Sequence, residues 1–159
     1  MAGVTPTVVD AFDGVDVEVD VVVGPGFSTE QESEIVARAA AISATTTVVR
    51  DPDDLPERMF RADFAVTTAS TTTYELLALG TPIVSTAVVE NQQRIATALR
   101  ERDAAEVVVA ADGCDAFGAA IQRYVSDDHL RRTRMEEGRN LVDGKGAQRI
   151  ADVIHEHVE

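Results

Sequence analysis

A run of small and hydroxyl-bearing residues is the part of this sequence best suited to ligand chemistry. Ala69, Ser70, Thr71 and Thr72 precede an apolar helical pattern, and Glu75 follows one turn later. Threonine is a poor helix former, because its branched side chain loses rotamer freedom and competes for backbone hydrogen bonds. The first turn of a helix, however, has unpaired N–H groups and the positive end of the helix dipole, which together favour anions. The residues from Ala69 to Thr72 are therefore candidates for holding a diphosphate.

Glu75 has two interpretations on its spacing alone. An ionised carboxylate only accepts hydrogen bonds, so it suits a pair of hydroxyl groups such as the ribose diol of a nucleotide. Alternatively, Thr72 and Glu75 have the spacing of a capping box, in which the glutamate bonds back to the start of its own helix. The pattern leaves both roles open.

Two alternating periods along the chain predict the elements that position these residues. Short β-branched runs are typical of buried strands, and the segments between them have helical spacing. We expect strands over 16–23, 45–50, 64–68, 83–88 and 106–110. We expect helices over 5–12, 29–41, 53–61 and 91–102, a helix that contains Glu75 and ends at Gly80, and two or three C-terminal helices. Ser28 and Gln31 form a second candidate capping box.

This alternation predicts an α/β fold, a Rossmann-like parallel sheet with helices on both faces. Ligands of such sheets bind beyond the carboxyl ends of the strands, where loops lead into helices. The loops at 24–28, 50–54, 68–72, 88–92 and 111–115 should therefore share one rim. Gly24–Gly26 is only a GxG sequence without the third glycine of the dinucleotide fingerprint, so NAD is weakly supported.

Composition indicates one domain over residues 1–159 and a strongly acidic surface. The chain has 28 acidic and 14 basic side chains, a net charge of −14, and lysine only at position 145. Such a surface repels itself unless salt screens it, which favours a halophilic protein and disfavours nucleic acid as a partner. The sequence contains no apolar run long enough for a transmembrane segment and no signal-peptide pattern, so we expect a cytoplasmic protein.

The remaining polar residues predict structure rather than chemistry. Cys114 is the only cysteine, so an internal disulfide and a CxxC metal or redox site are excluded, and a small residue entering a helix is the favoured interpretation. We expect neither a metal nor a catalytic histidine, because the histidines lie in the polar C-terminal part. These histidines are His129, His155 and His157. A basic cluster interleaved with glutamates is interpreted as a solvated helix face. Its arginines are Arg131, Arg132, Arg134 and Arg139.

The segment 62–105, ADFAVTTASTTTYELLALGTPIVSTAVVENQQRIATALRERDAA, resembles the nucleotide-binding, C-terminal lobe of the GT-B glycosyltransferase superfamily. Within it the likeness is to the UDP-sugar hydrolase of pseudaminic acid synthesis and to spore-coat polysaccharide biosynthesis proteins. The segments 22–27, VVGPGF, and 141–151, LVDGKGAQRIA, resemble the same group, so the likeness covers nearly the whole chain. The combination of motifs is more specific than any one of them.

The resemblance implies a UDP-sugar site. It implies that the turn at the helix start contacts the UDP diphosphate, that the glutamate holds the ribose, that an Asn-Gln pair lies near the sugar, and that the base lies along the loop after the second strand. It implies no bound metal or further cofactor. The implied nucleotide-binding residues are Gly26, Pro52, Leu55, Ala69, Ser70, Thr71, Thr72 and Glu75, and the sugar-binding residues are Asn91 and Gln92.

Two departures from the family pattern qualify this expectation. The usual Gly-Gly is Ala69-Ser70, and a Cβ at each position limits how closely the backbone approaches phosphate. The family's lobe also begins with a further strand and a glycine-rich loop, and its partner lobe carries the catalytic histidine. We therefore expect a lobe that lacks the first strand with its loop and the partner lobe, with no catalytic residue in this chain.

The implied function is the UDP-sugar-binding lobe of a glycosyltransferase-like or UDP-sugar hydrolase enzyme in surface glycan biosynthesis. Alternatives are a non-catalytic nucleotide-sugar-binding or regulatory module, or one subunit of a two-chain glycosyltransferase.

Overall fold

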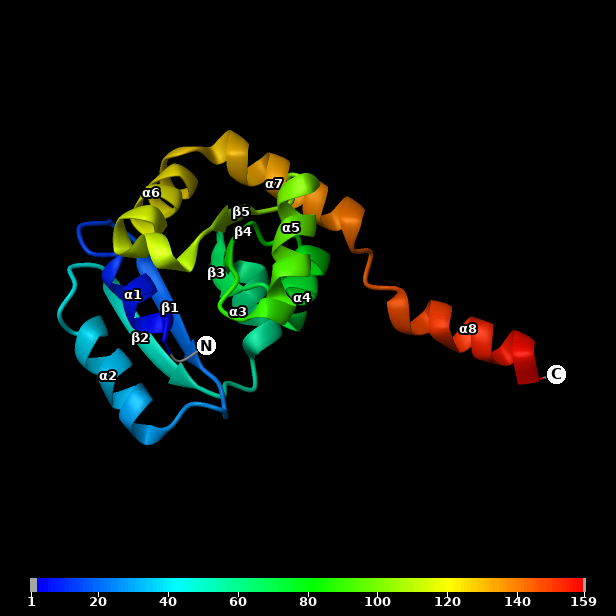
Figure 1. The fold of residues 1–159 in the computed structure, drawn as a ribbon, viewed down its shortest axis with the longest axis horizontal. Helices are drawn as coiled ribbons and strands as arrows, with labels where there is room; N and C mark the ends of the chain where they lie inside the picture. Colours follow the sequence, from blue (N-terminus) through cyan, green and yellow to red (C-terminus); the bar gives the residue numbers. More distant parts are fainter. Residues whose placement is uncertain (1–2, 159) are drawn as a thin grey trace.

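The computed structural model describes residues 3–158 as alternating strands and helices (Figure 1). The strands are β1 (Glu18–Val23), β2 (Thr45–Arg50), β3 (Ala65–Thr68), β4 (Ile83–Thr86) and β5 (Glu106–Val108). The helices are α1 (Thr5–Asp10), α2 (Thr29–Ala39), α3 (Leu55–Arg61), α4 (Thr71–Leu79), α5 (Gln93–Glu101), α6 (Gly113–Ser126), α7 (Asp128–Leu141) and α8 (Gly146–Val158), with short 3-10 turns η1 (Glu90–Gln92) and η2 (Ala110–Asp112). The predicted order of elements is confirmed, with ends that differ by a few residues.

All strand pairs are parallel, and helices surround them, so the predicted Rossmann-like α/β arrangement is confirmed. The strands do not form one continuous ladder, however. β1 pairs with β2, and β3, β4 and β5 pair in that order as a separate sheet. The parallel arrangement is as predicted, and its division into two ladders could not be predicted, because β-branched periodicity marks a strand and does not show which strand it pairs with.

Three apolar clusters fill the space between strands and helices. One lies under α1 and α6 and centres on Phe12, Phe117 and Tyr124. A second joins α2 to β1 around Ile35. The third joins α3, α4 and α5 to β4, and its largest members include Leu77. Helices therefore cover both faces of the strands, which excludes water from the parallel ladders.

Helix α4 is fixed at its C-terminal end by a glycine and by a close neighbour. Gly80 has φ of +78°, the left-handed conformation that glycine adopts most easily, and the N–H of Thr81 donates to the carbonyl of Leu76 at 2.9 Å. α7 packs on this helix at Gly138, where an added Cβ would lie 3.1 Å from Cδ2 of Leu77. The predicted helix end at Gly80 is confirmed.

The basic cluster on α7 is only partly solvated. Arg134 is buried, with 8% of its surface exposed, and forms an ion pair of 2.6 Å with Asp103. Arg131 donates to the carbonyl of Tyr124 at the end of α6. The interpretation of a solvated helix face is therefore wrong for Arg134. Its side chain connects α7 to the turn before β5, and its ion pair with Asp103 allows the guanidinium to be buried.

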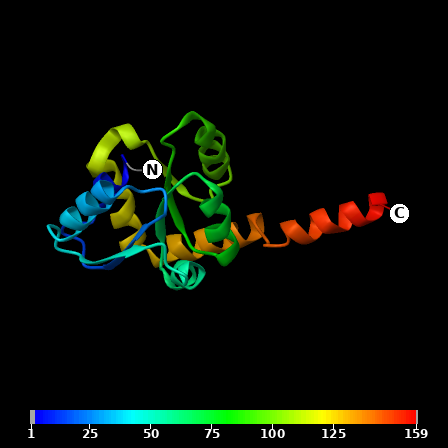
Figure 2. The same ribbon diagram turned by 90° about the horizontal axis from the view of Figure 1, so that it is seen from below.

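The last helix, α8, projects from the body of the molecule (Figures 1 and 2). Its side chains are exposed over 146–157, and Ile150, Val153 and Ile154 form an apolar stripe at helical spacing with 64%, 54% and 56% of their surfaces exposed. Asp143 and Arg149 form an ion pair of 2.7 Å at its start. Across the described residues 3–158, we find no helix that combines the length and the apolar character needed to span a bilayer.

Candidate functional site

The loop between β3 and α4 holds the residues predicted to contact a diphosphate. The N–H of Ala69 donates to the carbonyl of Thr86 at 2.8 Å, which ties this loop to the end of β4. Ala69 is fully buried, and Ser70 is the N-cap residue of α4 with φ of −135°. This extended backbone accepts any residue, so Ala and Ser fit where the resembling family has glycine. Thr71 and Thr72 form the first turn of the helix.

Thr73, rather than Glu75, closes the start of α4. The N–H of Ser70 donates to Oγ1 of Thr73 at 3.3 Å, and that hydroxyl donates to the carbonyl of Thr68 at 3.3 Å. The capping box therefore joins Ser70 and Thr73. The alternative capping box of Thr72 and Glu75 is wrong, because the helix begins two residues earlier than that pairing requires. Glu75 is exposed and remains available for a ligand.

The N-terminal end of α4 is free of negative charge in an acidic protein. α2, α3, α6 and α7 each have an acidic residue in the first turn, whereas α4, like α1, α5 and α8, has none. A carboxylate there would neutralise the positive end of the helix dipole. Because the N–H groups of Thr71 and Thr72 have no acceptor within the helix, they can donate to an anion.

Two buried hydroxyl groups lie at the end of the neighbouring strand. Ser85 and Thr86 are 0% and 1% exposed, and the Oγ of Ser85 and Oγ1 of Thr86 have no hydrogen-bond partner within residues 3–158. An unsatisfied buried hydroxyl costs about 1–3 kcal/mol. Thr86 is also the residue whose carbonyl receives the N–H of Ala69. Its hydroxyl is therefore available close to the predicted anion site. Sequence reasoning missed it, because a threonine in a strand fits the β-branched pattern.

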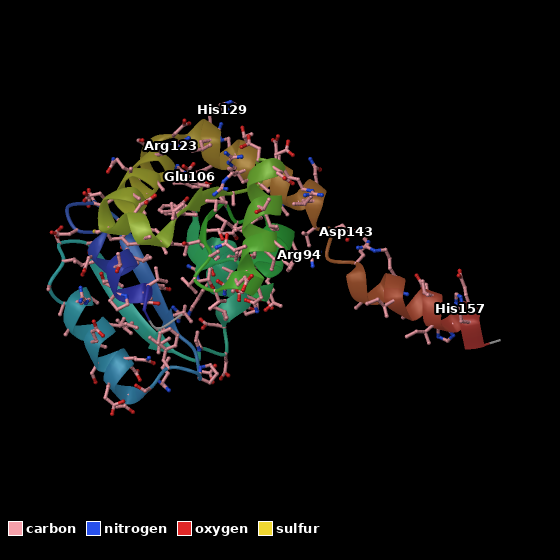
Figure 3. The ribbon with its side chains drawn as sticks, in the orientation of Figure 1. Arg94, Glu106, Arg123, His129, Asp143 and His157 are labelled. Carbon is pink, nitrogen blue, oxygen red and sulfur yellow. The ribbon has the colours of Figure 1, made fainter. Side chains whose placement is uncertain are left out.

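The predicted sugar-binding residues lie in the loop after β4, the strand whose end is bonded to Ala69. Asn91 and Gln92 form most of η1, immediately before α5. Oε1 of Gln92 accepts the N–H of Val88 at 2.9 Å, so this oxygen shapes the loop and leaves the amide NH₂ for a ligand. Arg94, which sequence reasoning passed over, is exposed in the first turn of α5 and points outward (Figure 3). Its guanidinium suits a phosphate or carboxylate.

The remaining predicted nucleotide-binding residues follow β1 and β2. The N–H of Asp51 donates to the carbonyl of Val23 at 2.9 Å, which joins the loops that carry Gly26 and Pro52. Asp51 has φ of +44°, a strained conformation that Asp tolerates better than most residues. Leu55 begins α3 and is half-buried against the third apolar cluster. The predicted site thus falls into two groups, one after β1 and β2 and one after β3 and β4.

A small hollow lies near the second group, but none of the predicted site residues lines it. This hollow of about 170 Å³ lies between α5 and the end of β5, lined by Ala87, Gln93, Thr97 and Val109 among others. Sites for small molecules usually enclose about 300–1,000 Å³. The hollow is therefore too small to enclose a nucleotide by itself.

Groups that could perform chemistry lie elsewhere in the chain. His129 lies on α7 and His157 on α8, both far from α4 in the view of Figure 3. Within residues 3–158 no group of three or more His, Cys, Asp or Glu side chains is arranged to hold a metal ion. Burial and the nearby carboxylates of Asp10, Asp115 and Asp13 raise the pKa of the Cys114 thiol, which keeps it protonated at neutral pH.

Comparisons with known proteins give a consistent picture of the fold. Neither a scan of protein-family profiles nor a search of curated proteins finds a match to this sequence. Among solved structures, the chain is similar to MurG of Acinetobacter baumannii, with a TM-score of 0.78 and 16% identity over 98% of this chain and 45% of that one. It is also similar to WaaG, a glycosyltransferase involved in lipopolysaccharide biosynthesis, with a TM-score of 0.68 and 17% identity over 96% of this chain and 43% of that one.

The fold is therefore Rossmann-like, with parallel strands and surrounding helices arranged as in these two structures. The chain spans less than half the length of the two structures that it matches. The fold that the resemblance implied is confirmed. The specific likeness to UDP-sugar hydrolases and spore-coat proteins stays a prediction.

Proposed function

We propose that this chain is the UDP-sugar-binding lobe of a glycosyltransferase-like or UDP-sugar-hydrolysing enzyme of surface glycan biosynthesis. In this proposal the amides of Thr71 and Thr72 hold the diphosphate, and Glu75 accepts hydrogen bonds from the ribose diol. Asn91 and Gln92 lie toward the sugar, and the loop containing Pro52 and Leu55 lies toward the base.

One observation carries the proposal: the acid-free start of α4, anchored to β4 through Ala69 and Thr86. Backbone amides at a helix N-terminus are suited to phosphate oxygens. Glu75 lies one turn further along the same helix and is exposed. A phosphate held at the helix start would leave an attached ribose within reach of that carboxylate.

The proposal includes a second lobe, in this or another polypeptide, that supplies the catalytic residues. The small size of the hollow near α5 supports this, because it cannot enclose a nucleotide-sugar by itself. The apolar stripe of Ile150, Val153 and Ile154 on α8 also supports it, since exposed patches of this kind mark interaction sites. In two-lobed enzymes, closure aligns the reacting groups and excludes water.

A non-catalytic nucleotide-sugar-binding module is the second candidate. It is favoured by the placement of the histidines on α7 and α8, away from the start of α4. A general base must lie within about 2.6–3.2 Å of the proton that it removes, or act through one water. Glu75 engaged with a ribose could not serve as that base.

Calorimetric titration in molar KCl tests the binding proposal. We expect UDP and UDP-N-acetylglucosamine to bind with dissociation constants between about 1 μM and 1 mM, and NAD to bind more weakly. CMP provides a control for the base, and inorganic diphosphate provides one for the anion site alone. Absence of a measurable heat with UDP at millimolar concentration would reject the proposed function.

A further inference from the structure

β5 forms one edge of the sheet that also contains β3 and β4. Within the described residues 3–158 it pairs only with β4. Helix α5 packs beside it (Figure 1). The backbone groups on the outer side of an edge strand are available to a strand from another polypeptide. The edge of β5 is therefore a place where an extended segment can pair with this protein.

The hydroxyl of Tyr124 shows which backbone groups of β5 point outward. It accepts the N–H of Glu106 at 3.3 Å and donates to the carbonyl of Ile83 in β4 at 3.0 Å, so the N–H of Glu106 points toward β4. Residues of a parallel strand bond alternately to the two sides, so Glu106 and Val108 bond toward β4. The N–H and the carbonyl of Val107 therefore point to the open edge.

The hollow of about 170 Å³ lies along this edge, between the strand and the helix. α5 contributes Gln93, Thr97 and Arg100 to its lining, and the strand side contributes Val107 and Val109. The side chain of Val107 packs in the third apolar cluster, on the α5 side of the strand. Val109 follows on the same side, because residues two apart in a strand share a face, and it is 53% exposed. The helix and the strand edge together form a groove for the side chains of an added strand.

Arg100 gives this groove a positive charge. Its side chain is exposed and takes part in none of the ion pairs formed among residues 3–158. In a chain with 28 acidic side chains, an arginine that lines a hollow without a carboxylate partner favours a ligand that supplies one. A second copy of the chain fits less well, because each copy has a net charge of −14 and would bring another Arg100 to the same edge.

The direction of α5 sets the order of the two subsites along the groove. α5 leads into β5 through a short turn, so Arg100 near the end of the helix lies toward the start of β5. Val109 lies at the other end of the strand. A segment antiparallel to β5 passes Val109 first and Arg100 second.

We propose that the groove between α5 and β5 binds an extended segment of another polypeptide, which adds to β5 as an antiparallel strand and carries a carboxylate two residues after a branched aliphatic side chain. The residue with the carboxylate exchanges both backbone hydrogen bonds with Val107, and its side chain pairs with Arg100. The aliphatic side chain fills the hollow beside Val109. Strand addition of this kind takes affinity from the main chain and specificity from alternate side chains. No predicted nucleotide- or sugar-binding residue lines the groove, so the proposal does not depend on the proposed function.

The probe is a fluorescently labelled peptide, Thr-Val-Thr-Glu-Thr-Thr, with acetylated and amidated ends. Fluorescence anisotropy in molar KCl measures its affinity, and NMR measures hydrogen exchange at the amide of Val107, with that of Val108 as the internal reference. One control peptide has Gln in place of Glu, and another is N-methylated at Glu, which removes its backbone donor. Arg100→Gln is the test variant. Arg102→Gln is its matched control, because Arg102 is exposed near the same end of α5 and does not line the hollow.

We expect the peptide to bind with a dissociation constant between about 10 μM and 1 mM. Arg100→Gln and the Gln peptide should each weaken binding by at least about threefold, and Arg102→Gln should change it by less than about twofold. N-methylation should weaken binding by about tenfold, because a backbone hydrogen bond is lost. At saturation, exchange of the Val107 amide should slow by at least about tenfold, while that of Val108 stays unchanged.

Absence of binding at millimolar peptide would overturn the proposal. So would equal effects of Arg100→Gln and Arg102→Gln, or exchange at Val107 that the bound peptide leaves unaltered. A Val107 amide that is already protected in the free chain, together with a dimer in sedimentation, would assign the edge to a second copy and also overturn it. UDP titration is a separate measurement, so failure of the peptide to bind leaves the proposed function intact.

Discussion

The N–H of Ser70 donates to Oγ1 of Thr73 at 3.3 Å, and this bond closes the start of α4 without Glu75. The threonine run that looks unfavourable for a helix thus supplies the cap of that helix. Because Thr73 is buried and bonds to the carbonyl of Thr68 as well, it links the helix to the end of β3. Glu75 is left exposed on the next turn, and the two residues can be tested separately.

Replacing Glu75 should affect ligand binding and leave stability nearly unchanged. A charge-assisted hydrogen bond contributes about 1.5–3 kcal/mol, so Glu75→Ala should weaken UDP binding by roughly tenfold to a hundredfold. Glu75→Gln should weaken it less, because the amide oxygen still accepts one hydroxyl. Calorimetry measures the affinity, and thermal unfolding measures the stability of each variant.

Thr73→Val is the matched control for the cap. It keeps the shape of the side chain and removes the hydroxyl that receives the N–H of Ser70. We expect a loss of about 1 kcal/mol of unfolding free energy. If Glu75→Ala loses this much stability and keeps its affinity for UDP, Glu75 has a structural role and does not bind the ribose.

The chain alone should bind a UDP-sugar without turning it over. A panel of UDP-sugars is incubated with the purified chain in molar KCl, and release of UDP is followed. We expect none above the uncatalysed rate, because the histidines lie on α7 and α8 and Glu75 engaged with the ribose cannot serve as a general base. Multiple turnovers that disappear in Glu75→Ala would mean that the chain contains a complete active site.

Removing the hydroxyl of Tyr124 should destabilise the sheet formed by β4 and β5. This hydroxyl is buried, donates to the carbonyl of Ile83 at 3.0 Å and accepts the N–H of Glu106 at 3.3 Å. Tyr124→Phe leaves both backbone groups without this partner, so we expect a loss of about 1–3 kcal/mol in chemical unfolding. Tyr74→Phe is the control, because Tyr74 is 49% exposed and should change stability by less than about 0.5 kcal/mol.

Salt should stabilise the folded chain strongly. Its 28 acidic side chains repel one another, and the screening length falls from about 30 Å at 0.01 M salt to about 3 Å at 1 M. The melting temperature should therefore rise between dilute buffer and molar KCl. A flat melting temperature across this range would contradict the halophilic interpretation of the composition.

The ion pair at the start of α8 should weaken in acid. A hydrogen bond from Arg149 is the main cause that lowers the pKa of Asp143 from 3.8 to about 2. Because the pKa is lower in the folded chain, the interaction stabilises the start of α8 above about pH 4 and is lost as the pH falls toward 2. NMR titration of the Asp143 carboxyl carbon measures this, with Arg149→Gln as the control. A pKa near 3.8 in the unaltered chain would show that the pair is absent in solution.

The sequence by itself determined the alternation of strands and helices and several of their ends. The predicted capping box of α2 is present, since Ser28 and Gln31 exchange hydrogen bonds of 2.9 and 3.3 Å. Gly80 ends α4 in the left-handed conformation. These features depend on residues a few positions apart, so local spacing is enough to predict them.

The tertiary structure decided which groups meet across long stretches of chain. It buried Arg134 against Asp103, 31 residues away, and placed the unpaired hydroxyl of Thr86 beside the loop that begins α4. It also separated β1 from β3, although both fit the same pattern of a buried strand. Hydrophobic periodicity reports the environment of a residue and not the identity of its neighbours, so the pairing of strands depends on three-dimensional packing.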